Sequence, residues 1–153
     1  MRARWKPSGE VVFTGEEKAR AMSTPEFPDR GILWRGWDEE TLRIINEKQQ
    51  PVLLFVADTD PFVWPFLRET FKEMPNNAKL RDLLHARCPA LYFEVGKLPE
   101  ELKQLGAGSR YHIAILSPYG LTPLVTIDPA GGNPAEIVER ITLILERILE
   151  NWR

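Results

Sequence analysis

Asp58, Asp60 and His112 are the residues of this chain whose types could perform acid–base chemistry together. A carboxylate that orients a histidine can support general acid–base catalysis or contribute two ligands to a metal. No serine or cysteine nucleophile is obviously placed beside them, and two or three ligands make a poor metal site. Asp-x-Asp-Pro is also a common way to form a turn or cap a helix. We therefore interpret the aspartates as loop and cap residues, and keep a non-thiol enzyme built on Asp60 and His112 as an alternative.

Cys88 is the single cysteine of the chain, so no intramolecular disulfide can form. Disulfide exchange needs an attacking thiolate, usually beside a second thiol. Cys88 comes at the end of an amphipathic helical segment and just before an expected strand, a position that favours a buried, inert thiol. A lone cysteine is what a reducing compartment allows. A single-thiol activity at Cys88 stays open as a further alternative.

Phe62, Trp64 and Phe66 lie within five residues, too close for all three to face one side of a helix. At least one should be exposed, and exposed aromatic side chains suit protein binding. Trp34 and Trp37, in contrast, are expected in the core across the edge of a sheet. Residues 106–110 (Gly-Ala-Gly-Ser-Arg) lack the Lys-Ser/Thr of a phosphate loop and follow a helix, so we expect a turn there.

The composition describes one ordinary globular domain. The chain has 153 residues, of which 43% are hydrophobic and 27% charged, and its net charge is −2. This net charge gives no overall electrostatic attraction to nucleic acid or to an anionic membrane. No apolar run is long enough for a secretory signal or a transmembrane segment. We expect a cytoplasmic protein with an N-terminal arm over residues 1–31 and a folded domain over residues 32–153.

The apolar spacing predicts the elements that must position these residues. Residues 51–56 form a continuous apolar run, which is typical of a central strand covered on both faces. Further strands are expected over residues 90–95, 112–117 and 121–127, the last two joined as a hairpin. Helices are expected over residues 38–48, 63–74, 77–88, 99–105 and 133–152, with caps at Asp38 and Asn133. The order predicts an α/β fold with a mixed sheet of about four strands flanked by helices.

Residues 32–40 resemble an Ile-x-Trp-x-x-Trp-x-x-Glu signature. This signature belongs to the thioredoxin-like N-terminal domain of the YyaL and spermatogenesis-associated type of protein. Further similarities follow in the same order and at the same spacing, at residues 51–56, 69–71, 93–95 and 116–120, so that the resemblance covers residues 32–128. It implies a thioredoxin-like fold.

The departures from that family concern its chemistry. Asp60 and Val63 stand where the family has its two cysteines, and Tyr111 stands where thioredoxin-like folds have a cis-proline. A cis bond before a non-proline residue costs about 3–4 kcal/mol, so we expect a trans bond there. In such a fold the two loops face each other, and Asp60 is expected to approach Tyr111 and His112. The resemblance thus implies the scaffold and argues against redox activity.

We therefore expect a redox-inactive thioredoxin-fold protein that acts by binding, as an accessory or assembly subunit of a larger complex. Its partner should be a protein and not a nucleic acid, and neither a cofactor nor a metal is expected. The candidate binding surface comprises Asp60, Pro61, Phe62, Val63, Trp64, Phe66, Tyr111 and His112.

Overall fold

The computed structural model describes residues 31–152, and the expected N-terminal arm lies outside the described residues apart from Gly31. The strands are β1 (Trp34–Arg35), β2 (Val52–Ala57), β3 (Ala90–Glu94), β4 (Ile113–Leu116) and β5 (Pro123–Ile127). The helices are α2 (Glu39–Lys48), α3 (Trp64–Glu73), α4 (Ala78–Ala86), α5 (Glu100–Gln104) and α6 (Pro134–Glu150). Short 3-10 turns lie at Met74–Asn76, Val95–Lys97 and Pro129–Gly131.

The five strands form one sheet in the order β1-β3-β2-β4-β5. β2 pairs in parallel with β3 and antiparallel with β4, and β4 pairs antiparallel with β5. The sequence predicted about four strands, and the difference is β1, in which Trp34 pairs in parallel with Ala90. A strand of two residues is too short to show any periodicity, so it left no signal in the sequence.

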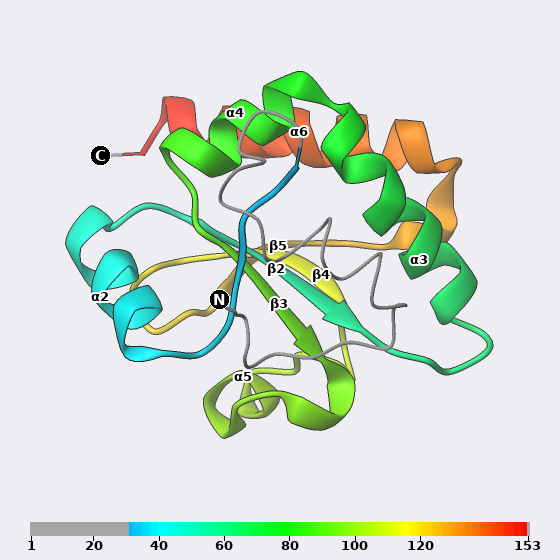
Figure 1. Ribbon diagram of the computed structural model, residues 1–153, viewed down its shortest axis with the longest axis horizontal. Coiled ribbons are helices and arrows are strands. Elements are labelled where there is room, and N and C mark those ends of the chain that lie inside the picture. Colours follow the sequence, from blue (N-terminus) through cyan, green and yellow to red (C-terminus); the bar gives the residue numbers. More distant parts are fainter. Residues whose placement is uncertain (1–30, 153) are drawn as a thin grey trace.

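β2 is the central strand, and each of its six residues is buried, as its continuous apolar run predicts. Its side chains alternate between two core clusters. Leu53 and Phe55 belong to the cluster beneath α3, α4 and α6, whereas Leu54 and Val56 belong to the cluster beneath α2 and α5. Figure 1 shows α3, α4 and α6 together along one side of the sheet and α5 on the other. The sheet is therefore covered by helices on both faces.

The predicted caps begin the helices. Asp38 Oδ1 accepts a hydrogen bond from the backbone N–H of Thr41, and Asn133 Oδ1 accepts one from that of Glu136. Pro134 takes the first position of α6, where its missing N–H costs nothing. Both helices begin where the sequence predicts.

The order of the elements and the directions of the strands are those of a thioredoxin-like α/β fold, which confirms the predicted fold class. Within residues 31–152, no helix combines the length and the apolar character that crossing a membrane requires.

Candidate functional site

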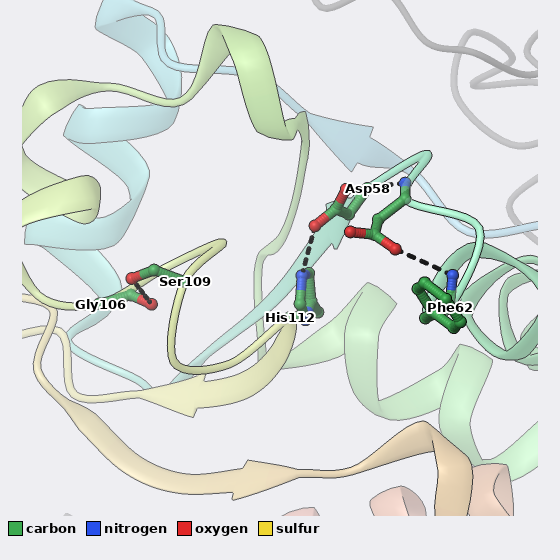
Figure 2. A network of polar contacts seen from close by, with 6 residues as sticks. Asp58, Phe62, Gly106, Ser109 and His112 are labelled. Atoms are coloured by element: carbon green, nitrogen blue, oxygen red, sulfur yellow. Dashed lines mark hydrogen bonds and ion pairs between the residues drawn. The ribbon is translucent and has the colours of Figure 1, made fainter.

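The loop that follows β2 is fixed by its own aspartates. The N–H of Asp60 donates to Asp58 Oδ1 at 3.0 Å, and the N–H of Phe62 donates to Asp60 Oδ1 at 2.9 Å. The N–H groups of Val63 and Trp64 then donate to the carbonyl oxygen of Asp60, which begins the first turn of α3. These are the turn interactions that Asp-x-Asp-Pro predicts. The predicted capping role is wrong, because the N-cap residue of α3 is Val63 and no side chain accepts a hydrogen bond there. Figure 2 shows Asp58 and Phe62 on this loop.

Asp58 also contacts His112, which comes directly before β4. His112 Nε2 lies 2.9 Å from Asp58 Oδ2, and the two side chains are only 16% and 19% exposed. The pairing of β2 with β4 brings them together, because the N–H of Val56 donates to the carbonyl of His112 at 2.7 Å. Figure 2 shows this contact across the two loops. The loops therefore face each other as predicted.

The carboxylate on the histidine belongs to Asp58, whereas the sequence pointed to Asp60. Asp58 follows the strand directly, so the strand pairing carries it to His112. Asp60 lies two residues further along the chain, and its carboxylate accepts a hydrogen bond from the N–H of Phe62 instead. Within residues 31–152, His112 Nδ1 makes no hydrogen bond, which leaves this nitrogen free to exchange a proton.

The aromatic side chains of the loop and of α3 divide between surface and core. The Phe62 side chain is 87% exposed, and Phe66 is also exposed. Trp64 and Val63 are partly buried and pack against the larger core cluster. The prediction that at least one of the three aromatics is exposed is confirmed, and the side chain presented most openly is Phe62.

Tyr111 lies beside His112 but faces the core. Its ring is buried in the cluster beneath α5, and its hydroxyl has no hydrogen-bond partner among the described residues. Burial raises the pKa of this phenol above its usual range. The bond before Tyr111 is trans, as predicted. Because the side chain is buried, Tyr111 can offer a partner only its backbone.

Cys88 lies at the other end of the central strands from this loop. It precedes β3, and the N–H of Leu53 at the beginning of β2 donates to the carbonyl of the adjacent Pro89, whereas Asp58 follows the end of β2. The thiol is 1% exposed, and burial raises its pKa to about 12, against the weaker opposing effect of Arg87 and Lys48. Few thiolates would form at neutral pH, so the geometry gives no support to a single-thiol activity.

The Gly106 turn is not a phosphate site. The N–H groups of residues 106–110 each donate to a backbone carbonyl, which leaves none to cradle an anion. Gly106 and Gly108 both have positive φ angles, as a turn of this kind requires. Among residues 31–152, no three His, Cys, Asp or Glu side chains are grouped closely enough to hold a metal ion.

Comparison with known proteins gives matches among solved structures alone. No protein-family model matches the chain, and no curated protein matches it significantly. Among solved structures, the chain is similar to a protein described as DsbH oxidoreductase, with 15% sequence identity and a TM-score of 0.48. The match covers 91% of this chain and 95% of that one.

Proposed function

We propose that this protein binds another protein through the surface around Phe62, as an accessory or assembly subunit of a larger complex. The observation that carries the proposal is the nearly full exposure of the Phe62 ring on a loop held by its own hydrogen bonds. Burying a large apolar side chain against a partner is favourable, and exposed aromatic side chains are frequent anchors of protein interfaces. Because the loop is already ordered, little conformational entropy is lost on binding.

The binding surface, as proposed, is formed by the exposed residues Asp60, Pro61, Phe62 and Phe66, with Val63 and Trp64 beneath them and His112 beside them. Phe62 and Phe66 offer apolar contact, and the Asp60 carboxylate offers an acceptor for an N–H group or a cation of the partner. A nucleic acid is a poor partner for a chain of net charge −2.

Absence of thiol redox activity is part of this proposal. The positions where a thioredoxin-like fold carries its two cysteines are Asp60 and Val63, and the one cysteine is buried far from them. A reducing, cytoplasmic setting is also proposed, and the unpaired state of Cys88 is consistent with it.

We further propose that the chain is a diverged relative of the thioredoxin-like domain of the YyaL and spermatogenesis-associated type of protein. The residues of the shared signature have structural roles that support this: Trp34 is buried in β1, Trp37 packs against Phe93, and Asp38 caps α2. The division into an arm over residues 1–31 and a domain over residues 32–153 belongs to the same proposal.

The test is affinity purification from the source organism with quantitative mass spectrometry of three forms: the unaltered chain, Phe62→Ala and Tyr119→Ala. Tyr119 is an exposed aromatic in the turn before β5, at the other end of β2 from the loop, and serves as the matched control. A genuine partner is retained by Tyr119→Ala and weakened by Phe62→Ala, by about 1–2 kcal/mol or more in a direct titration. Recovery of the protein without any partner that depends on Phe62 would overturn the proposal.

Redox inactivity has its own measurement, the reduction of insulin disulfides by the purified protein with dithiothreitol present. The expected rate is that of dithiothreitol alone, and Cys88→Ala is the control for any thiol contribution. Appreciable acceleration by the unaltered chain would refute this part of the proposal without bearing on protein binding.

A non-thiol enzyme is the second candidate, and the contact between Asp58 Oδ2 and His112 Nε2 favours it. A carboxylate-oriented histidine with its other nitrogen unbound is a possible general base. The variants His112→Gln and Phe62→Ala separate the two functions. If the protein is an enzyme of this kind, His112→Gln abolishes turnover and leaves partner binding unchanged. If it acts by binding, Phe62→Ala has the larger effect on the affinity for the partner.

A further inference from the structure

An exposed apolar patch lies far from the Phe62 loop, where the edge strand β5 meets α6. Leu143 of α6 is 56% exposed, and Leu124 of β5 is also exposed. Between the strand and the helix runs a groove of about 560 Å³ that is lined mainly by Leu124, Val125, Leu143, Ile144, Ile148 and Trp152. Leu143 and the groove form one surface, called the α6 patch below.

Two opposite charges flank Leu143 symmetrically along the helix. Glu139 precedes it by four residues and Arg147 follows it by four, so the three side chains lie on one stripe of α6. Both charged residues are exposed, and neither forms an ion pair within residues 31–152. Arg147 also lines the groove. The helix thus offers a cation and an anion about 12 Å apart, with an apolar residue midway.

We propose that the α6 patch is a homodimer interface in which two copies of α6 pack antiparallel about a two-fold axis at Leu143. The symmetry makes the patch complementary to itself, because a two-fold axis at Leu143 places Glu139 against Arg147 of the second copy, and Arg147 against Glu139 of the second copy. The Leu143 side chains of the two copies contact each other at the axis, and each copy covers the groove of the other. The arrangement matches the i±4 ridge packing that helices prefer, at a crossing angle of about 50°.

The remaining charges of α6 are compatible with this pairing. Arg140 falls opposite Glu146 of the second copy, a further attractive pair, although Glu146 already contacts Lys79 at 3.1 Å. Glu136 falls opposite Glu150 of the second copy, about 10 Å from the axis, where helices that cross at this angle have diverged. The attractive pairs are therefore nearer the axis than the repulsive one.

β5 offers a second copy or a peptide little opportunity to add a strand. The strand begins with Pro123, which has no N–H to donate, and its pairing with β4 is irregular between Ile115 and Leu116. Proline and bulges are the features by which edge strands avoid further pairing. A contact through the side chains of α6 thus suits this edge better than an extension of the sheet.

The test is the oligomeric state of the full-length chain, measured by sedimentation velocity from about 1 to 300 μM, a range that detects the modest affinity of a small interface. The unaltered chain should show reversible dimerisation in this range, and Leu143→Asp should be monomeric throughout. A chain that is monomeric at every concentration would overturn the proposal, as would a dimer that Leu143→Asp leaves intact. Circular dichroism confirms the fold of each variant.

Charge reversal tests the orientation of the helices. Glu139→Arg and Arg147→Glu each turn two attractive pairs of the dimer into two repulsive ones, so each should weaken dimerisation about tenfold or more. The double variant restores both pairs and should recover most of the affinity. Glu101→Arg and Lys103→Glu, equal charge changes at exposed positions of α5, should have no such effect.

Three results would count against this geometry. If the single reversals dimerise like the unaltered chain, α6 is not the interface. If the double variant is weaker than both single variants, the helices do not pair antiparallel about Leu143. If the α5 controls weaken dimerisation equally, the effect is one of net charge and not of contact.

Discussion

The Cys88 thiol gives the most quantitative prediction about this fold. It lies 1% exposed in the larger core cluster, and burial raises its pKa from the ordinary value of 9.0 to about 12. Between pH 9 and 12 the unfolded chain releases the proton while the native state keeps it. The contribution of this thiol to the free energy of unfolding is therefore fully present below about pH 9, and it decreases as the pH rises above that value.

The size of the effect follows from these two pKa values. At pH 10 the thiol of the unfolded chain is about nine-tenths ionised and that of the native chain about one-hundredth, which lowers the free energy of unfolding by about 1.4 kcal/mol. At pH 8 the loss is less than about 0.1 kcal/mol. The native protein should therefore lose about 1.3 kcal/mol through Cys88 alone over these two pH units.

Urea denaturation of the unaltered chain and of Cys88→Ala at pH 8, 9 and 10 measures this loss. Other groups titrate in the same range, but they are shared by both proteins and cancel in the difference. The variant also leaves a small void, which shifts its stability by an amount independent of pH. If both proteins lose the same stability between pH 8 and 10, Cys88 ionises in the native state and the thiol is not buried as described.

Three further substitutions test the packing that positions the two surfaces. Gly108→Ala should cost about 2 kcal/mol or more in thermal or urea denaturation, because φ is +82° there and the new Cβ would lie 2.9 Å from side-chain atoms of Leu98 and Val95; a neutral result would mean that the turn before β4 differs. Asn133→Ala should cost about 1 kcal/mol through the lost cap of α6, and Asn133→Ser should recover most of it. Trp152→Phe should cost about 1 kcal/mol, because it removes the 2.7 Å hydrogen bond from Nε1 to the carbonyl of Gln49 while an aromatic ring remains. The Trp152 ring also stacks on Tyr119, with ring centroids 6.1 Å apart, so an equal loss in a Tyr119→Ala control would assign the effect to stacking instead.

The sequence predicted the helices, the long strands and the central position of residues 51–56, because their signals are local. The cap at Asp38 and the proline at the beginning of α6 are read from neighbouring residues, and the burial of β2 from an unbroken apolar run. β1 could not be predicted in this way. Its two residues become a strand only because β3 lies beside them, and that pairing joins Trp34 to Ala90 across 56 positions of the chain.

The candidate site was predicted to the level of its loops but not to the level of its contacts. The facing of the two loops followed from the expected fold, and the exposure of at least one aromatic residue followed from the spacing of Phe62, Trp64 and Phe66. Which aspartate contacts His112 depends on the register of β2 against β4 and on where the loop turns. A difference of two residues decides between Asp58 and Asp60, and neither hydrophobic spacing nor turn propensity resolves it. The burial of Tyr111 was missed for the same reason.

The Asp58–His112 contact joins the two loops of the candidate site. With acidic residues on one loop and a tyrosine and a histidine on the other, the sequence indicates only that the two loops should face each other. In the structure, Asp58 Oδ2 and His112 Nε2 of these two loops lie 2.9 Å apart. Asp58 is also the acceptor for the N–H of Asp60, whose carboxylate in turn accepts the N–H of Phe62.

A continuous chain of hydrogen bonds therefore runs from His112, at the beginning of β4, to the backbone that carries the most exposed aromatic side chain of the described residues. A histidine kept only as a general base would not need to be joined to an exposed phenylalanine. A loop kept to present Phe62 does need a support, because a mobile loop would lose conformational entropy on binding. The connection between the pair and Phe62 is thus better explained by binding than by catalysis.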